Sequence, residues 1–121
     1  MLFGVGNLGS AFLRYPGFRR EKVKLVAAFD VSPRKIGKKI EGVRIYPVER
    51  APEIIKRCHA DIGIIAVPKE HCQEVADYMV LSGLYRIVNF APCSISSPAR
   101  VQVRNIDFTI EFLSLFCDTQ K

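Results

Sequence analysis

The sequence predicts an α/β fold in which a doubly wound parallel β-sheet is covered by helices. The first observation behind this prediction is a series of nearly unbroken apolar stretches, as parallel strands buried on both faces require. The second is that helical segments and short connections separate these stretches, so strands and helices alternate. The apolar stretches are residues 23–29, 61–67 and 85–90, and the helical segments are residues 7–15, 51–58 and 69–82.

The chain opens with MLFGVGNLGS, which predicts a short buried strand, a tight glycine turn and the start of a helix. Gly4, Gly6 and Gly9 form the pattern GxGxxG, whose glycines permit a tight turn, close approach of a pyrophosphate and close packing of helix on strand. The helix start directs free N–H groups and a positive dipole end at the turn, which favours a phosphate. Alone, this pattern is weak evidence, because such a string also occurs by chance in loops.

The first helix is predicted from Asn7 to Tyr15, since its apolar residues recur at helical intervals and Pro16 follows. The next strand, Val23 to Phe29, ends at Asp30, about twenty residues after Gly9. At that offset a dinucleotide site carries the acid that binds the adenosine ribose hydroxyls. A carboxylate repels a 2′-phosphate, so the pattern favours NAD(H) over NADP(H). In the alternative interpretation, Asp30 only caps the turn after it.

The rest of the chain continues the alternation of strands and helices. The expected features are a short helix at Pro33 to Lys38, a turn at Gly42, strands at Val43 to Tyr46 and Val101 to Asn105, a helix start at Pro68, a left-handed helix end at Gly83 and a loop at Ala91 to Ala99. Residues 106–117 predict a final helix that is apolar on nearly all sides, which indicates contact with a second subunit. We therefore expect a nucleotide-binding domain at residues 1–105 and a dimerisation helix at residues 106–121.

The ligand of a doubly wound sheet lies at the carboxyl ends of the strands, where the strand order reverses. Here that point falls between the first strand and the strand at residues 61–67. The predicted cofactor-binding residues around it are Gly4, Val5, Gly6, Asn7, Leu8, Gly9, Asp30, Val31, Ala66, Val67, Pro68, Asn89, Phe90, Ala91 and Pro92. Asn89 and Phe90 are equally compatible with an ordinary strand end.

Composition narrows the possible functions. The chain has 121 residues, the length of one domain, and a net charge of +6. Its basic residues are scattered, without a helix-turn-helix, zinc or basic-zipper pattern, so we expect no specific DNA binding by this chain. No apolar run is long enough to span a membrane and no signal peptide is recognisable, so we expect a cytoplasmic protein.

The sequence predicts neither a metal site nor a catalytic centre. Its cysteines, Cys58, Cys72, Cys93 and Cys117, form no CxxC pair and have no zinc-like spacing, so we expect reduced, structural thiols. The two histidines, His59 and His71, have no partner at catalytic spacing. No tyrosine is followed four residues later by lysine, the pair that short-chain dehydrogenases use.

Several motifs together resemble the dinucleotide-binding domain of the Rex redox-sensing transcriptional repressors. They are GVGNLGSA, YPGF, AAFDVSPRKIGKKI, AVPKE, IVNFAP and VRNIDFTIEFLSL. The resemblance implies a sensor of the NADH to NAD⁺ ratio that binds its cofactor without turning it over. It also implies a homodimer with exchanged C-terminal helices, and DNA contact only through a winged-helix domain that precedes the glycine pattern in the family and is missing here.

The resemblance assigns further roles by motif position. Tyr15 and Asp107 match residues at the subunit interface that respond to the redox state, and Phe108 matches a residue near the nicotinamide. Phe112, Leu113 and Phe116 belong to the helix expected at the interface. Two alternatives remain: the cofactor domain of an NAD-dependent oxidoreductase, and a related fold that binds coenzyme A or another adenine nucleotide.

Overall fold

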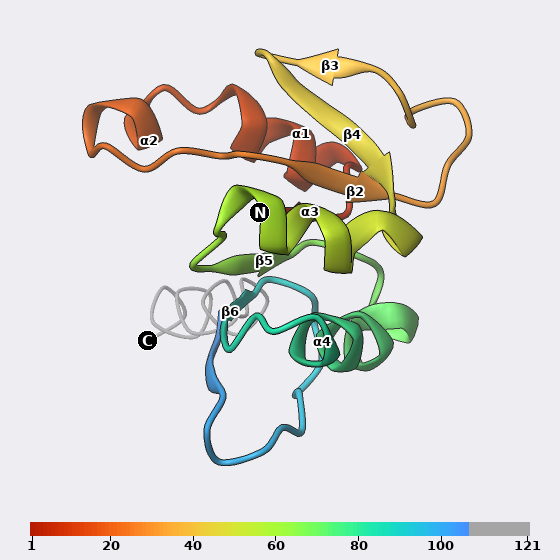
Figure 1. The fold of residues 1–121 in the computed structure, drawn as a ribbon, viewed down its shortest axis with the longest axis vertical. Helices are drawn as coiled ribbons and strands as arrows, with labels where there is room; N and C mark the ends of the chain where they lie inside the picture. Colours follow the sequence, from red (N-terminus) through yellow and green to blue (C-terminus); the bar gives the residue numbers. More distant parts are fainter. Residues whose placement is uncertain (107–121) are drawn as a thin grey trace, which may run out of the picture.

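The computed structural model describes residues 1–106, apart from the side chain of Arg19 (Figure 1). In this part of the chain the strands are β1 (Leu2–Phe3), β2 (Ala28–Asp30), β3 (Lys39–Ile40), β4 (Val43–Pro47), β5 (Gly63–Ile65), β6 (Arg86–Asn89) and β7 (Gln102–Asn105). The helices are α1 (Asn7–Arg14), α2 (Gly17–Arg20), α3 (Ala51–Cys58) and α4 (Cys72–Leu81), with 3₁₀ turns η1 (Val48–Arg50) and η2 (Lys69–His71).

The strands form one sheet with the order β3-β4-β2-β1-β5-β6-β7. All neighbours are parallel except β3 and β4. The central strand β1 pairs with β2 on one side and with β5 on the other, so the strand order reverses there. This confirms the predicted doubly wound fold and places the carboxyl end of β1 at the predicted ligand position.

Two apolar clusters cover the two faces of the sheet. Phe3, Phe29 and Ile65 pack on one face with α3 and α4. Leu2 and Ala28 face the other way and pack against α1. Figure 1 shows α3 and α4 in front of the sheet and α1 behind it. Consecutive residues of the central strands therefore bury their side chains on opposite faces, which explains why these strands are apolar without interruption.

One edge of the sheet adds an antiparallel strand to the predicted parallel arrangement. Lys39 and Ile40 form a short antiparallel ladder with Arg44 and Val43. The connecting residues Glu41 and Gly42 have positive φ angles of 50° and 80°. Two left-handed residues in succession match the twist of a tight hairpin, so a turn that was predicted correctly at Gly42 also creates an extra strand.

Other predicted elements are shorter than expected or absent. The strand predicted from Val23 begins only at Ala28, where the ladder with Leu2 of β1 starts. The helix predicted at Pro33 to Lys38 is a series of turns that ends at Gly37, whose φ is +89°.

The region after the first helix also differs from prediction. α1 ends at Arg14, because Tyr15 precedes a proline and adopts an extended conformation with ψ 113°. A short additional helix, α2, follows at Gly17–Arg20. The prediction at Gly83 is confirmed, since it has a φ of +92° just after α4. Among the described residues, no helix is long and apolar enough to cross a membrane.

Candidate functional site

The glycine turn lies at the carboxyl end of β1, and each of its three glycines has a different environment. Gly4 has a φ of +101°, and a Cβ there would lie 2.5 Å from the carbonyl oxygen of Ala66. A Cβ on Gly9 would collide with the carbonyl oxygen of Gly4, because α1 packs directly on the turn. A Cβ on Gly6 would meet nothing within 4 Å. The first and third glycines are therefore required by packing, whereas the second leaves open space beside exposed backbone.

The start of α1 is suited to an anion. Gly6 is the N-cap and supplies no side-chain hydrogen bond, and the first turn contains no acidic residue. Asn7 and Leu8 are exposed at this helix end. The first N–H groups and the positive end of the helix dipole are therefore not neutralised by a side chain of the helix itself, as a phosphate-binding helix start requires.

Asp30 and Lys35 hold the turn through the two backbone groups of Val5. The N–H of Val5 donates to Asp30 Oδ2 over 2.8 Å, and the Lys35 ammonium donates to the carbonyl oxygen of Val5 over 2.6 Å. The N–H of Ser32 donates to Asp30 Oδ1 over 2.9 Å. Asp30 therefore caps its own turn, as the alternative interpretation expects, and also positions the glycine turn. Each carboxylate oxygen can accept a further hydrogen bond, so the two roles do not exclude binding of ribose hydroxyls.

A cavity of about 530 Å³ opens beside the turn. It brings together eight of the predicted residues, from the ends of β1, β2 and β5. These are Gly4, Val5, Gly6, Asp30, Val31, Ala66, Val67 and Pro68. Val31 is 79% exposed at this site, an apolar side chain available to a flat aromatic ligand. The glycine turn, the acid after β2 and the wall after β5 are thus parts of one site.

The sequence interpretation missed the wall that α4 and the segment after β4 contribute. Lys35, Val48, Glu49, His71, Glu74, Val75 and Tyr78 also line the cavity. His71 Nδ1 lies 3.8 Å from Glu74 Oε2, and the Tyr78 hydroxyl donates to the carbonyl oxygen of Glu49 over 3.2 Å. The available signal was the helical spacing of Glu74, Val75 and Tyr78, which places them on one face of α4, with His71 immediately before the helix.

The residues predicted at the end of β6 do not line this cavity. The Asn89 side chain is fully buried and is used within the protein. Phe90 lies on the α1 side of the sheet, where its ring centroid is 4.7 Å from that of Phe12. Ala91 is buried and Pro92 is exposed. Because β6 pairs with β5, all four residues stand at the neighbouring strand end.

The predicted interface residues are only partly covered by the structure. Tyr15 is 53% exposed and packs edge-on against Phe18 at a centroid distance of 5.1 Å. Five further predicted residues, Asp107, Phe108, Phe112, Leu113 and Phe116, lie outside the described residues. Within residues 1–106, no group of histidine, cysteine and acidic side chains is arranged to hold a metal ion.

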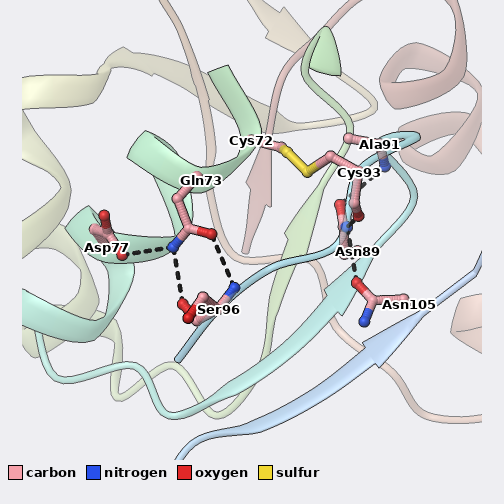
Figure 2. Close-up of a disulfide and its surroundings, with 8 residues drawn as sticks. All are labelled: Cys72, Gln73, Asp77, Asn89, Ala91, Cys93, Ser96 and Asn105. Atoms are coloured by element: carbon pink, nitrogen blue, oxygen red, sulfur yellow. Dashed lines mark hydrogen bonds between the residues drawn. A yellow bond between two sulfur atoms is a disulfide. The ribbon is translucent and has the colours of Figure 1, made fainter. Parts of the chain in front are cut away.

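The prediction of reduced cysteines is wrong for one pair. Cys72, the first residue of α4, forms a disulfide with Cys93 in the loop after β6 (Figure 2). Their Cα atoms are 6.8 Å apart although 21 positions separate them in sequence. The tertiary structure brings them together because β6 lies beside β5, from which the chain runs into α4. Cys58 is a free, half-buried thiol, as predicted.

Comparison with known proteins shows which family the sequence matches. The family model described as "CoA binding domain" matches residues 1–93. A redox-sensing transcriptional repressor Rex of Pelotomaculum thermopropionicum is 47% identical over 110 residues, which cover 91% of this chain and 52% of that protein. The chain thus spans about half the length of the curated relatives it matches.

Solved structures agree with this likeness. The crystal structure of RSP, a Rex-family repressor, in complex with NADH superposes with a TM-score of 0.88 at 34% identity, over 94% of this chain and 55% of that one. RSP in complex with NAD⁺ and operator DNA gives a TM-score of 0.90 at 34% identity, over 94% of this chain and 52% of that one. The resemblance predicted from the motifs is therefore confirmed.

Proposed function

The chain belongs to the family of CoA binding domains, and on this premise we propose that it is the NAD(H)-binding half of a Rex-type redox-sensing repressor. One observation carries the proposal: Asp30 holds the glycine turn through the N–H of Val5 and lines the same cavity as the open face of Gly6. An acid for the ribose and a backbone cradle for the pyrophosphate are therefore adjacent, as a dinucleotide requires. The complexes of RSP with NADH and NAD⁺ support this choice of ligand.

The same acid argues against coenzyme A, although the family model bears that name. The adenosine ribose of coenzyme A carries a 3′-phosphate, which would stand beside the Asp30 carboxylate. Two like charges at this distance disfavour binding. Lys35 is committed to the carbonyl oxygen of Val5, so its ammonium is already engaged within the turn. The free hydroxyls of the NAD(H) ribose can instead donate hydrogen bonds to the carboxylate.

A sensor accounts for this site better than an enzyme does. Among the described residues, the acid–base pair that lines the cavity without supporting the turn is His71 with Glu74, whose side chains are 62% and 82% exposed. A hydride-transfer enzyme needs an acid or base held beside the substrate, which a solvent-exposed pair does not provide. The naming of the relatives as transcriptional repressors supports the same conclusion.

We further propose the assembly in which the sensor works. Residues 106–121, with Phe112, Leu113 and Phe116, form the helix exchanged in a homodimer, and Tyr15, Asp107 and Phe108 respond to the nicotinamide. DNA is bound through a separate winged-helix domain, in the cytoplasm. Regulation requires that NADH and NAD⁺ favour different dimer geometries, because a ligand that binds both equally shifts no population.

Titration with NADH, followed by the fluorescence of the reduced nicotinamide, tests the proposed ligand. We expect saturable binding that Asp30→Ala weakens at least about tenfold, the equivalent of one lost charged hydrogen bond. Asp61→Ala is the matched control, because Asp61 is an exposed aspartate that lies outside this cavity. The proposal fails if NADH does not bind, or if both variants bind it like the unaltered chain.

A competition experiment against bound NADH distinguishes a dinucleotide site from a coenzyme A site. NAD⁺ should displace NADH, and coenzyme A at the same concentration should not. A steady oxidation of NADH with small carbonyl substrates would instead support the oxidoreductase.

A further inference from the structure

The disulfide joins two segments that border the proposed cofactor site. Cys72 begins α4 and is 1% exposed, whereas Cys93 lies half-buried in the loop after β6. Residues 90–101 contain neither helix nor strand. The position of this loop therefore depends on individual contacts, of which the disulfide is the only covalent one among the described residues (Figure 2).

The other contacts hold the loop at two points. The buried Asn89 side chain accepts a hydrogen bond from the N–H of Ala91 over 2.9 Å and donates to the carbonyl oxygen of Cys93 over 2.8 Å. Further along, Gln73 on α4 pairs with the backbone of Ser96 in both directions, each over 2.8 Å. The loop is thus fastened to α4 by Cys93 and Ser96, through consecutive helix residues.

The same end of α4 forms a wall of the cavity. His71 and Glu74, which flank Cys72 and Gln73 in sequence, line the cavity on the other side of the helix, as does Val75. A change in how the loop holds the first turn of α4 therefore reaches the surface that would contact the ligand. The disulfide thus links the start of α4 to a loop that lies 21 positions further along the chain.

We propose that Cys72 and Cys93 are a thiol–disulfide exchange site that couples thiol redox state to cofactor affinity, as a second input beside the nicotinamide. This inference rests on the proposed function, including its cytoplasmic location, where disulfides are transient and regulatory rather than structural. The disulfide form holds α4 and the loop in the binding geometry. In the dithiol form the loop is no longer fixed to α4. Ligand binding must then order the loop and α4, which lowers the affinity.

The exchange partner is a dithiol, small or proteinaceous. One of its thiolates attacks the more accessible sulfur, that of Cys93, forming a mixed disulfide and releasing Cys72 as a thiolate that takes up a proton. The second thiol of the partner then displaces Cys93, which leaves as a thiolate and is also protonated. Two electrons and two protons pass to the protein, and the partner becomes a disulfide. Oxidation is the reverse reaction with an oxidised partner.

The test measures the NADH dissociation constant of the oxidised chain and of the chain reduced with dithiothreitol. A thiol assay in denaturant accompanies both measurements and should show two more thiols after reduction. We expect reduction to raise the dissociation constant about fivefold or more, the lower range of coupling between linked sites. The comparison needs no substitution, so it does not depend on the folding of a variant.

Variants then assign the effect to this pair. Cys93→Ser, which leaves the buried Cys72 in place, should bind NADH weakly with or without dithiothreitol. Cys58→Ser is the matched control and should keep the response, because Cys58 is a free thiol. Equal dissociation constants for the two redox forms, or no change in thiol number, would overturn the inference while leaving the proposed function intact. If neither form binds NADH, the proposed function fails and the inference fails with it.

Discussion

The two ends of the candidate site are stabilised by different means. At the glycine turn, the backbone of Gly9 packs directly on that of Gly4, and the N–H of Val5 donates to the Asp30 carboxylate. At the α4 end, side chains fasten a loop without regular structure, through the disulfide of Cys72 and Cys93. At Gly4 and Gly9 the first region has no room for a side chain, whereas the second region depends on a small number of separable contacts.

This difference indicates that the glycine turn is the rigid part of the site and that the loop and the start of α4 are the adjustable part. The turn connects the central strand β1 to α1, so it cannot move without disturbing the core. The loop and the start of α4 can change their connection while the sheet stays intact. A regulatory input is therefore expected at the second region, and ligand recognition at the first.

The largest expected effect comes from filling the glycine turn. Gly9→Val should destabilise the chain by about 4 kcal/mol or more, because the side chain would displace α1 from the Gly4 carbonyl. Gly6→Ala is the matched control: its methyl group meets nothing within 4 Å, so the stability should remain unchanged. NADH affinity should nevertheless fall about tenfold or more in Gly6→Ala, because the methyl group enters the cradle. Urea unfolding and NADH titration separate the two effects, and equal stability of both variants would contradict the packing argument.

The next largest effect lies at the opposite region. Asn89→Ala should cost about 3 kcal/mol, because it leaves the N–H of Ala91 and the carbonyl oxygen of Cys93 without their buried partner. Asn105→Ala, measured by the same urea unfolding, removes only the exposed acceptor 3.0 Å from the Asn89 amide and should cost less than about 1 kcal/mol. Similar losses in the two variants would show that the loop is not organised by Asn89.

A pH effect is expected at the amino end of β1, outside both regions of the site. The Met1 amine donates to the carbonyl oxygen of Ile62 over 2.9 Å, and burial lowers its pKa from 8.0 to about 6. Between these values the unfolded chain binds a proton that the folded chain does not, so stability should fall by about 2 kcal/mol from pH 8 to pH 6. Urea unfolding across this range measures the slope. In a chain that is extended before Met1, this nitrogen belongs to a peptide bond, so the dependence of stability on pH should disappear. If the extended chain shows the same slope, the amine is not its source.

The smallest effect is expected where the loop meets α4 near the surface. Gln73→Ala removes both hydrogen bonds to the backbone of Ser96 and should destabilise the chain by about 1 kcal/mol. Hydrogen exchange in residues 94–98 should increase at the same time. Asp77→Ala removes only the exposed carboxylate that Gln73 also contacts, so exchange in the loop should stay the same. Faster exchange in both variants would mean that Asp77 positions Gln73.

The sequence by itself determined the order of the elements and one half of the site. Apolar stretches broken by helical segments require a sheet covered on both faces, and the observed strand order confirms it. The spacing of Gly4, Gly6, Gly9 and Asp30 was enough to place a dinucleotide cradle, because that recognition uses local backbone conformation and one acid at a strand end. Local rules of this kind are visible in a single sequence.

Only the tertiary structure decided the other half. The use of Asn89 inside the loop and the pairing of Cys72 with Cys93 both depend on β6 lying beside β5. The hairpin at Lys39 and Ile40 likewise required a partner strand before it could form. Contacts between distant segments leave no periodic or spacing signal, because each one depends on where the sheet places two chain segments rather than on the residues between them.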